Sequence, residues 1–297
     1  MPGDLSGCRT SSVSPPRTWQ LIVSALPGTT RKIDRASSEC HHDRGDNHET
    51  TSDVRCGAIL AGCGDPAHSC AAGRCRAWRR ILELNRNTPS VFNALTDGTI
   101  YLGVSNGFRG TAEGARYFSD LVEEMEFKAA NGIGTMTDEQ YRLIFVGVPC
   151  YPIFRRFNEL FSEWGGTFVS STYLWFAAGG VSQGYEYDLT RPLESLATGL
   201  LIYVRNAMDS MFYQEEPLAE MIDTFNIDGI VYHPIKSCRT VSTGLADNRR
   251  ALMASRDIAS LFIESDMMDR RVVSEAQLKN RADAFFEGLA SRRLAAL

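Results

Sequence analysis

The second half of the chain contains four short apolar runs that alternate with segments of helical periodicity. The runs cover residues 142–148, 167–171, 230–232 and 260–263. Their length, their β-branched and aromatic content and their flanking turn residues are typical of buried strands. Because short buried strands separated by helices form parallel sheets, the pattern predicts an α/β fold: a doubly wound four-stranded parallel sheet with flanking helices.

Capping and breaking residues place the helix boundaries. Pro152 predicts the start of a helix that ends before Gly165, and the Ser274-x-x-Gln277 pair is a capping box for the last helix. Residues 172–190 are expected to form a long loop. The other helices expected in this half are 191–213, 217–225 and 243–255.

A helical segment is expected before the sheet. An apolar stripe begins near Ala77 and stops before Pro89, and Thr111 can cap a second helix that ends near Asn131. Glycine-rich residues 97–107 are expected to connect the two. The predicted organisation is a poorly ordered or non-native segment at 1–76, a helical connecting segment at 77–140 and an α/β C-terminal subdomain at 141–297.

Residues 1–76 lack sustained periodicity and are rich in Ser, Thr, Arg, Gly and Pro. They hold six of the eight cysteines and four of the five histidines, which suggests zinc. The cysteines form no C-x-x-C pair, however, and no secretory signal supports a disulfide framework. The pattern therefore favours neither zinc nor disulfides, and the segment is predicted to be poorly ordered or not native coding sequence.

Composition and charge narrow the function classes. The 297 residues are 43% hydrophobic, which is ample for a buried core, and the net charge of -5 comes without a basic run that would favour nucleic acid or lipid headgroups. No apolar stretch is long enough to span a bilayer, and no convincing cleavage pattern follows the N-terminus. We expect a cytoplasmic protein with no nucleic-acid or membrane partner.

The predicted sheet brings its chemically useful side chains to one edge. The carboxyl ends of parallel strands lie together, and ligands of such folds usually bind there. The loops after the four strands carry two thiols, an imidazole, a phenol, two cations and two carboxylates. These residues are Cys150, Tyr173, His233, Lys236, Cys238, Arg239, Glu264 and Asp266.

Two kinds of chemistry are open to Cys238 at this edge. Its neighbours Lys236 and Arg239 favour the thiolate, which is the form needed for nucleophilic attack or for binding iron. A nucleophilic pair with His233 lacks an identifiable orienting residue, and an iron-sulfur cluster needs more thiolates than this half of the chain supplies. Cys150 could equally be a small packed hydrophobe, and the whole loop could be solvated with an incidental thiol.

Several motifs carry a resemblance to a known family. They are K-S-C-R at 236–239, E-S-D-M-M-D at 264–269 and S-E-A-Q-x-x-x-R at 274–281, within longer similar segments that begin near Trp78. From there to its end the chain resembles the C-terminal part of the 2-hydroxyacyl-CoA dehydratase/benzoyl-CoA reductase family. Within that family it is most similar to the B-type subunits of ATP-dependent benzoyl-CoA reductases.

The resemblance implies an oxygen-sensitive iron-sulfur enzyme with a 4Fe-4S cluster. Two related catalytic subunits would bind an aromatic acyl-CoA, ATP-hydrolysing activator subunits would deliver low-potential electrons, and ferredoxin would be the donor. The reaction would be partial reduction of benzoyl-CoA to a cyclic dienoyl-CoA. Members of the family hold the cluster through cysteines from different subdomains.

The resemblance also assigns roles to individual residues. Cys238 stands where the C-terminal cluster ligand lies, and Cys150 is a second metal candidate. The thioester pocket would be lined by Tyr173, Lys236 and Arg239. The carboxylates Glu264 and Asp266 would orient the loop or transfer protons.

The chain departs from the family at its N-terminal end. Members begin with an α/β subdomain that carries further cluster cysteines, and residues 1–76 do not resemble it. A truncated and inactive product is therefore one expectation, because a cluster with too few ligands is labile. The alternatives kept open are a 2-hydroxyacyl-CoA dehydratase subunit and a non-catalytic partner-binding remnant.

Overall fold

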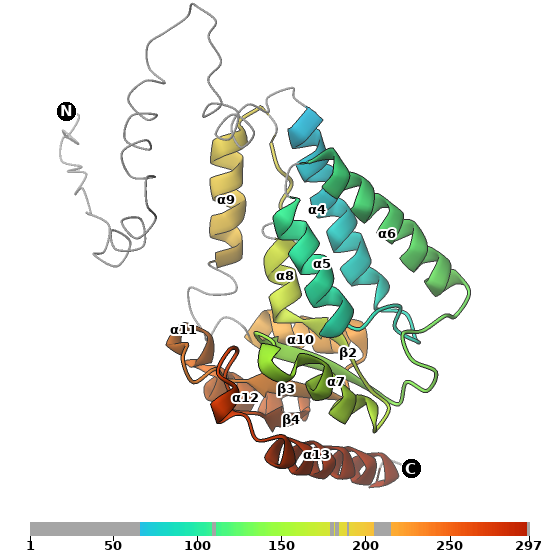
Figure 1. Cartoon of the computed structure of the whole chain (residues 1–297), viewed down its shortest axis with the longest axis vertical. Helices are drawn as coiled ribbons and strands as arrows, with labels where there is room; N and C mark the ends of the chain where they lie inside the picture. Colours follow the sequence, from blue (N-terminus) through green and yellow to red (C-terminus); the bar gives the residue numbers. More distant parts are fainter. Residues whose placement is uncertain are drawn as a thin grey trace, which may run out of the picture. The chain divides into compact units, whose positions relative to one another are not determined.

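The computed structural model in Figure 1 describes residues 66–108, 111–178, 181, 184–188, 190–204 and 215–295. Residues 1–65, which include most of the segment predicted to be poorly ordered, lie outside the described residues. The same holds for the cysteines at positions 8, 40, 56 and 63 and the histidines at positions 41, 42 and 48.

The described part is built around a four-stranded parallel sheet, as predicted. Its strands are β1 (Tyr141–Gly147), β2 (Gly166–Ser171), β3 (Gly229–His233) and β4 (Ala259–Phe262). The spatial order is β2-β1-β3-β4, and all three pairings are parallel. The chain thus runs from β1 to β2 on one side of it, and then crosses to β3 on the other side of β1. The strand order therefore reverses between β1 and β3.

Alternating side chains of these strands enter two separate apolar clusters. In β1, Leu143 and Phe145 belong to one cluster, whereas Ile144 and Val146 belong to the other. This period of two is what a strand buried on both faces produces. Both faces of the sheet must therefore be covered by helices.

The two faces are covered by different helices, as expected for a doubly wound sheet (Figure 1). On one face lie α7 (Phe154–Ser162) and α13 (Glu275–Ala295), whose buried residues join the cluster of Leu143. On the other lie α10 (Glu215–Phe225) and α12 (Leu245–Arg256), whose buried residues join the cluster of Ile144. The predicted α/β class is confirmed.

The helices before the sheet extend beyond those expected from the sequence. Helix α4 (Pro66–Leu84) begins at Pro66 rather than near Ala77, and it packs along α6 (Ala112–Ala130). Between them α5 (Thr96–Gly107) replaces the glycine-rich connection that we expected. Thr111 caps α6 as predicted, since its side chain accepts a hydrogen bond from the Gly114 amide.

Two further differences concern the second half. The predicted loop at 172–190 contains α8 (Thr172–Ala178). The helix predicted at 243–255 is α12, and a short helix that we did not expect, α11 (Arg239–Ser242), precedes it. Gly244, with a φ of +82°, separates these two helices. Helix α9 (Pro192–Val204) lies in the segment predicted to be helical, residues 191–213, of which residues 205–213 lie outside the description. The described residues also form two short 3-10 turns, η1 (Tyr151–Ile153) and η4 (Arg270–Val272).

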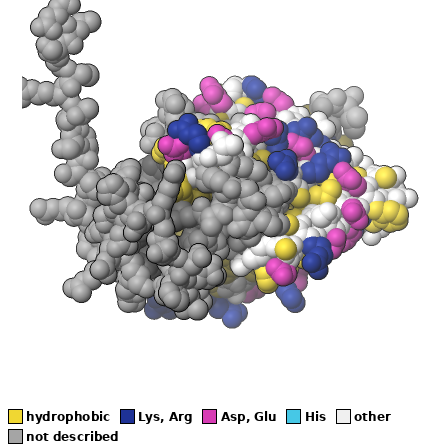
Figure 2. Space-filling view, turned by 90° about the horizontal axis from the view of Figure 1, so that it is seen from above, with side chains coloured by type: hydrophobic (Ala, Val, Ile, Leu, Met, Phe, Trp, Pro, Cys, Tyr) yellow, Lys and Arg dark blue, Asp and Glu magenta, His cyan; other side chains and the backbone are white. Residues whose placement is uncertain are grey.

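The described surface carries mixed charge. Figure 2 shows Lys and Arg side chains interspersed with Asp and Glu side chains on the part of this face that is described. Exposed ion pairs such as Arg80 with Glu126, which joins α4 to α6, contribute little stability each. None of the helices in the described ranges combines the length and apolarity needed to cross a bilayer.

Candidate functional site at the carboxyl edge of the sheet

The site is centred where the strand order reverses, between β1 and β3. Gly147 ends β1 with a φ of +125°, and a Cβ atom at this position would lie 2.7 Å from the carbonyl oxygen of His233. Only glycine permits both the dihedral angle and the approach. The close contact brings the loops that follow β1 and β3 together at the edge where ligands of open α/β sheets bind.

A buried polar network joins the loops after β1, β3 and β4. The Nδ1 atom of His233 lies 2.6 Å from the carbonyl oxygen of Val148, and its Nε2 atom lies 2.5 Å from Ser265 Oγ. Because a carbonyl only accepts, Nδ1 carries the proton and Nε2 accepts from the Ser265 hydroxyl. Burial lowers the pKa of His233, which favours the neutral imidazole. Both ring nitrogens are used, so a nucleophilic Cys238–His233 pair is not formed.

Cys150 lies at the end of this network. Its thiol is 1% exposed and its Sγ is 3.6 Å from Ser265 Oγ. Burial raises the pKa of the Cys150 thiol, although the hydrogen bond with Ser265 acts in the opposite direction. Of the two interpretations left open for Cys150, this placement favours the packed small hydrophobe over the metal ligand.

Asp266 connects the loop after β4 to the loop that carries Cys238. Its Oδ2 accepts from the Ser237 amide at 3.0 Å, and its Oδ1 accepts from the amides of Met268 at 3.0 Å and Asp269 at 3.1 Å. Hydrogen bonding from the Ser237 side chain, together with these amides, holds the pKa of Asp266 well below its usual range. The carboxylate is buried and fully engaged, so it is suited to orientation rather than to proton transfer.

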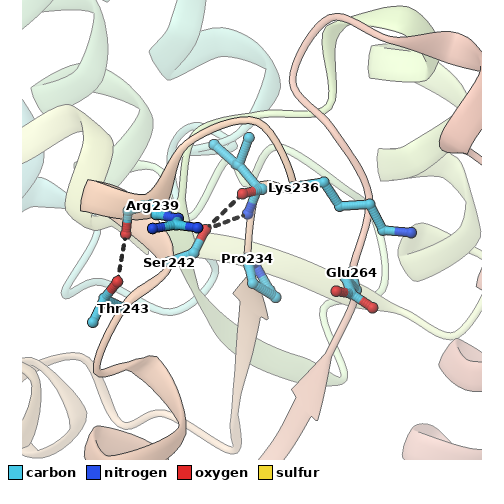
Figure 3. A pocket seen from close by; sticks show the side chains of 7 residues that line it. Pro234, Lys236, Arg239, Ser242, Thr243 and Glu264 are labelled. Carbon is cyan, nitrogen blue, oxygen red and sulfur yellow. Dashed lines mark hydrogen bonds between the residues drawn. The ribbon is translucent and has the colours of Figure 1, made fainter.

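The partly exposed Cys238 precedes α11 and is flanked by two exposed cations, Lys236 and Arg239. These cations contribute to a pocket of about 240 Å³ (Figure 3). In Figure 3 the side chain of Lys236 extends away from Arg239, which lies beside Ser242. The pocket is lined by Pro234, Ile235, Lys236, Arg239, Ser242, Thr243 and Glu264.

Glu264 and Tyr173 occupy different parts of this edge. Glu264 is exposed and lines the pocket. Tyr173 does not line it, and instead places its hydroxyl 3.2 Å from that of Tyr151. Tyr151 is tied to the loop after β4 by its amide, which donates to the carbonyl of Met267 at 3.2 Å. The two tyrosines thus form a second feature on the β1–β2 side of the edge.

The described residues do not assemble a complete metal centre. Within the described ranges, no group of three or more His, Cys, Asp or Glu side chains is placed to hold a metal ion. The free cysteines whose side chains are described are Cys75 and Cys150, which are buried, and Cys238, which is partly exposed. Since a 4Fe-4S cluster takes about four ligands, these residues fit a single ligand position, at Cys238, and not a whole cluster site.

Two residues of the edge were not singled out from the sequence. Ser265 is the partner of His233, and Tyr151 is the partner of Tyr173. Each stands beside a residue that was singled out, because Ser265 is the middle residue of the E-S-D motif and Tyr151 follows Cys150. The pairing of His233 with Ser265 depends on how β3 and β4 are aligned, and the parallel bridge between Ile235 and Ser265 continues that alignment beyond the strands.

Curated proteins similar to this chain are subunits of acyl-CoA enzymes. The B subunit of benzoyl-CoA reductase from Thauera aromatica is 32% identical over 222 residues, which is 72% of this chain and 50% of that protein. The (R)-phenyllactyl-CoA dehydratase alpha subunit of Clostridium sporogenes is 26% identical over 73% of this chain and 51% of that protein. The (R)-2-hydroxyisocaproyl-CoA dehydratase alpha subunit of Clostridioides difficile is 24% identical, over 73% and 52%.

The chain therefore spans about half the length of the curated relatives it matches. A sequence profile described as 2-hydroxyglutaryl-CoA dehydratase, D-component, matches residues 69–289. The matched range contains the whole sheet and all four loops of the edge. The chain belongs to the 2-hydroxyglutaryl-CoA dehydratase D-component family, which confirms the family resemblance found in the sequence.

Proposed function

We propose that this chain is a catalytic-subunit segment of a benzoyl-CoA reductase-type enzyme in which Cys238 is one ligand of a 4Fe-4S cluster. The observation that carries the proposal is the placement of Cys238. Among the cysteines whose side chains are described, it alone is partly exposed, and it lies beside a pocket with two cations. The higher identity to the benzoyl-CoA reductase relative, 32% against 26% and 24%, supports reduction over dehydration.

The pocket residues take roles that follow from their chemistry. Lys236 and Arg239 would bind the anionic phosphates of an acyl-CoA, and Tyr173 would contact the substrate from the β2 side of the edge. Glu264 is exposed in the pocket and is the carboxylate suited to proton transfer. Asp266 would orient the loop. A bound cluster would supply low-potential electrons to the ring.

The proposal requires partners and further ligands. A single described thiol cannot hold a cluster, so the remaining ligands would come from elsewhere in the chain or from a paired related catalytic subunit. The relatives described above are each one subunit of an enzyme, which supports such a pairing. We further propose that ATP-hydrolysing activator subunits and ferredoxin deliver the electrons, and that the protein is cytoplasmic.

Iron content tests the role of Cys238 directly. The chain should be purified anaerobically with its paired subunit, and iron and acid-labile sulfide measured in the wild type, Cys238→Ser and Cys150→Ala. Cys238→Ser should lose most of the iron, whereas Cys150→Ala, which alters a buried thiol, should keep it. Equal iron in the wild type and Cys238→Ser would refute the assignment. Iron in none of them would indicate the non-catalytic remnant.

Dehydration of a 2-hydroxyacyl-CoA is the second candidate reaction. The description of the matching family and the names of several relatives favour it. The purified complex should be assayed with benzoyl-CoA and with a 2-hydroxyacyl-CoA, with ATP and a reduced electron donor present. Consumption of benzoyl-CoA supports the reductase, and formation of an enoyl-CoA supports the dehydratase.

A further inference from the structure

We propose that Asp266 is a positioning residue that fixes the Cys238 loop, residues 234–238, and that the buried His233–Ser265 pair fixes Asp266 in turn. The inference rests on the proposed function, because it assumes that the geometry of Cys238 matters for holding iron. It assigns to Asp266 a structural task at the site in place of the proton-transfer role.

Two backbone amides of the Cys238 loop are held by the loop after β4. The loop leaves β3 after His233 and enters α11 at Arg239. At Ile235, the hydroxyl of Ser242 in α11 accepts from the amide at 2.7 Å and donates to the carbonyl at 2.8 Å. The amide of Lys236 donates to the carbonyl of Ser265 at 3.0 Å, and the next amide, that of Ser237, donates to Asp266 Oδ2 at 3.0 Å. Two successive amides just before Cys238 are therefore held by residues 265 and 266.

Asp266 acts as a cross-link between the two loops. One carboxylate oxygen accepts from Ser237, and the other accepts from the amides of Met268 and Asp269 in its own loop. A carboxylate can accept at both oxygens, whereas an asparagine presents an NH₂ group to one of these donors. An Asp266→Asn substitution keeps the shape of the side chain and removes an acceptor that the loops share.

The neighbouring residue sets where Asp266 lies. Ser265 is 2% exposed, and its hydroxyl is held by the imidazole of His233, which is itself held by the Val148 carbonyl of the loop after β1. This places the start of the β4 loop against the ends of β1 and β3. His233 and Ser265 are thus buried and hydrogen-bonded to each other, next to the loop that carries the partly exposed Cys238.

Hydrogen exchange measures this role without bound iron. Amide exchange of Lys236 and Ser237 should be followed by mass spectrometry or NMR in the iron-free full chain for the wild type, Asp266→Asn and Asp269→Asn. Asp269 is a matched control, because it is a carboxylate in the same loop that pairs with Arg271. Loss of one hydrogen bond to a charged acceptor should speed exchange at Ser237 roughly tenfold in Asp266→Asn and leave it unchanged in Asp269→Asn.

A second variant and a second readout complete the test. Ser265→Ala, which removes only the hydroxyl, should also speed exchange at Ser237. In the anaerobic complex Asp266→Asn should lose iron while Asp269→Asn retains it. Unchanged exchange at Ser237, or full iron in Asp266→Asn when Cys238→Ser has lost it, would overturn the inference. Full iron in Cys238→Ser would instead overturn the proposed function on which the inference rests.

Discussion

Acidification below about pH 6.5 should destabilise the folded chain through His233. Its imidazole is fully buried and packs against the rings of Phe145 and Phe157. Burial lowers the pKa of His233, while the hydrogen bond with the Val148 carbonyl and the charge of Asp266 oppose this effect without reversing it. The folded state therefore binds a proton at His233 less readily than the unfolded state does.

The sign and size of the effect follow from proton linkage. The stability that depends on neutral His233 is fully present above the unfolded pKa of about 6.5 and is lost as the pH falls below it. If the folded state stays unprotonated down to pH 5.5, the free energy of unfolding falls by about 1.4 kcal/mol between pH 7.5 and 5.5. This is an upper value. Once His233 is protonated in the folded state as well, a further fall in pH no longer lowers the free energy of unfolding through this residue.

The measurement is a difference between two proteins at two pH values. The wild type and His233→Gln should be unfolded with urea at pH 7.5 and at pH 5.5, and the loss of stability between these values compared. Glutamine does not titrate, so His233→Gln should lose about 1.4 kcal/mol less than the wild type, while all other groups cancel. Equal losses in both proteins would refute a buried neutral His233.

Two further substitutions, at Arg142 and Gly147 of β1, test by urea unfolding the packing that positions the site. Arg142→Met should lower the free energy of unfolding by about 3–5 kcal/mol, because it leaves the buried carboxylate of Glu139 without its cationic partner. Arg156→Met, at an exposed ion pair, should leave the free energy of unfolding almost unchanged. Similar losses in both would contradict the burial difference. Gly147→Ala should cost about 1–3 kcal/mol, since the new Cβ would meet the carbonyl of His233; an unaltered unfolding midpoint would contradict this.

The sheet could be predicted from the sequence because its signals are local. Each strand is an apolar run bounded by turn residues, and every residue of β1 and β3 is buried. Helices α5 and α8 could not be predicted in the same way. A Cβ atom on Gly98 of α5 would lie 2.4 Å from a methyl group of Leu174 in α8, so the glycine allows these two helices to pack closely. Gly98 and Leu174 are far apart in the sequence. Rules that use only neighbouring residues therefore assign this glycine to a turn.

The sequence was enough to predict where the candidate site lies, but it predicted only part of the contacts within the site. Parallel topology was enough to bring the loops containing Cys238 and Asp266 to one edge, and the structure joins these loops through Ser237. Which side chains of these loops are buried could not be deduced from the sequence, because this depends on the alignment of β3 with β4. That alignment turns His233 and Ser265 toward each other and leaves Glu264 exposed in the pocket.

Burial divides the edge into two layers with different tasks. His233 and Ser265 form a neutral, hydrogen-bonded layer in which a change of charge would be costly. Lys236 and Glu264 form an exposed layer in which charged groups remain solvated and free to meet a ligand. Cys238 stands at the boundary between the two layers. It is partly exposed, and the two amides that precede it are hydrogen-bonded to residues 265 and 266. The proposed role of Cys238 as an iron ligand needs both properties, whereas Cys150 is buried and lacks the first.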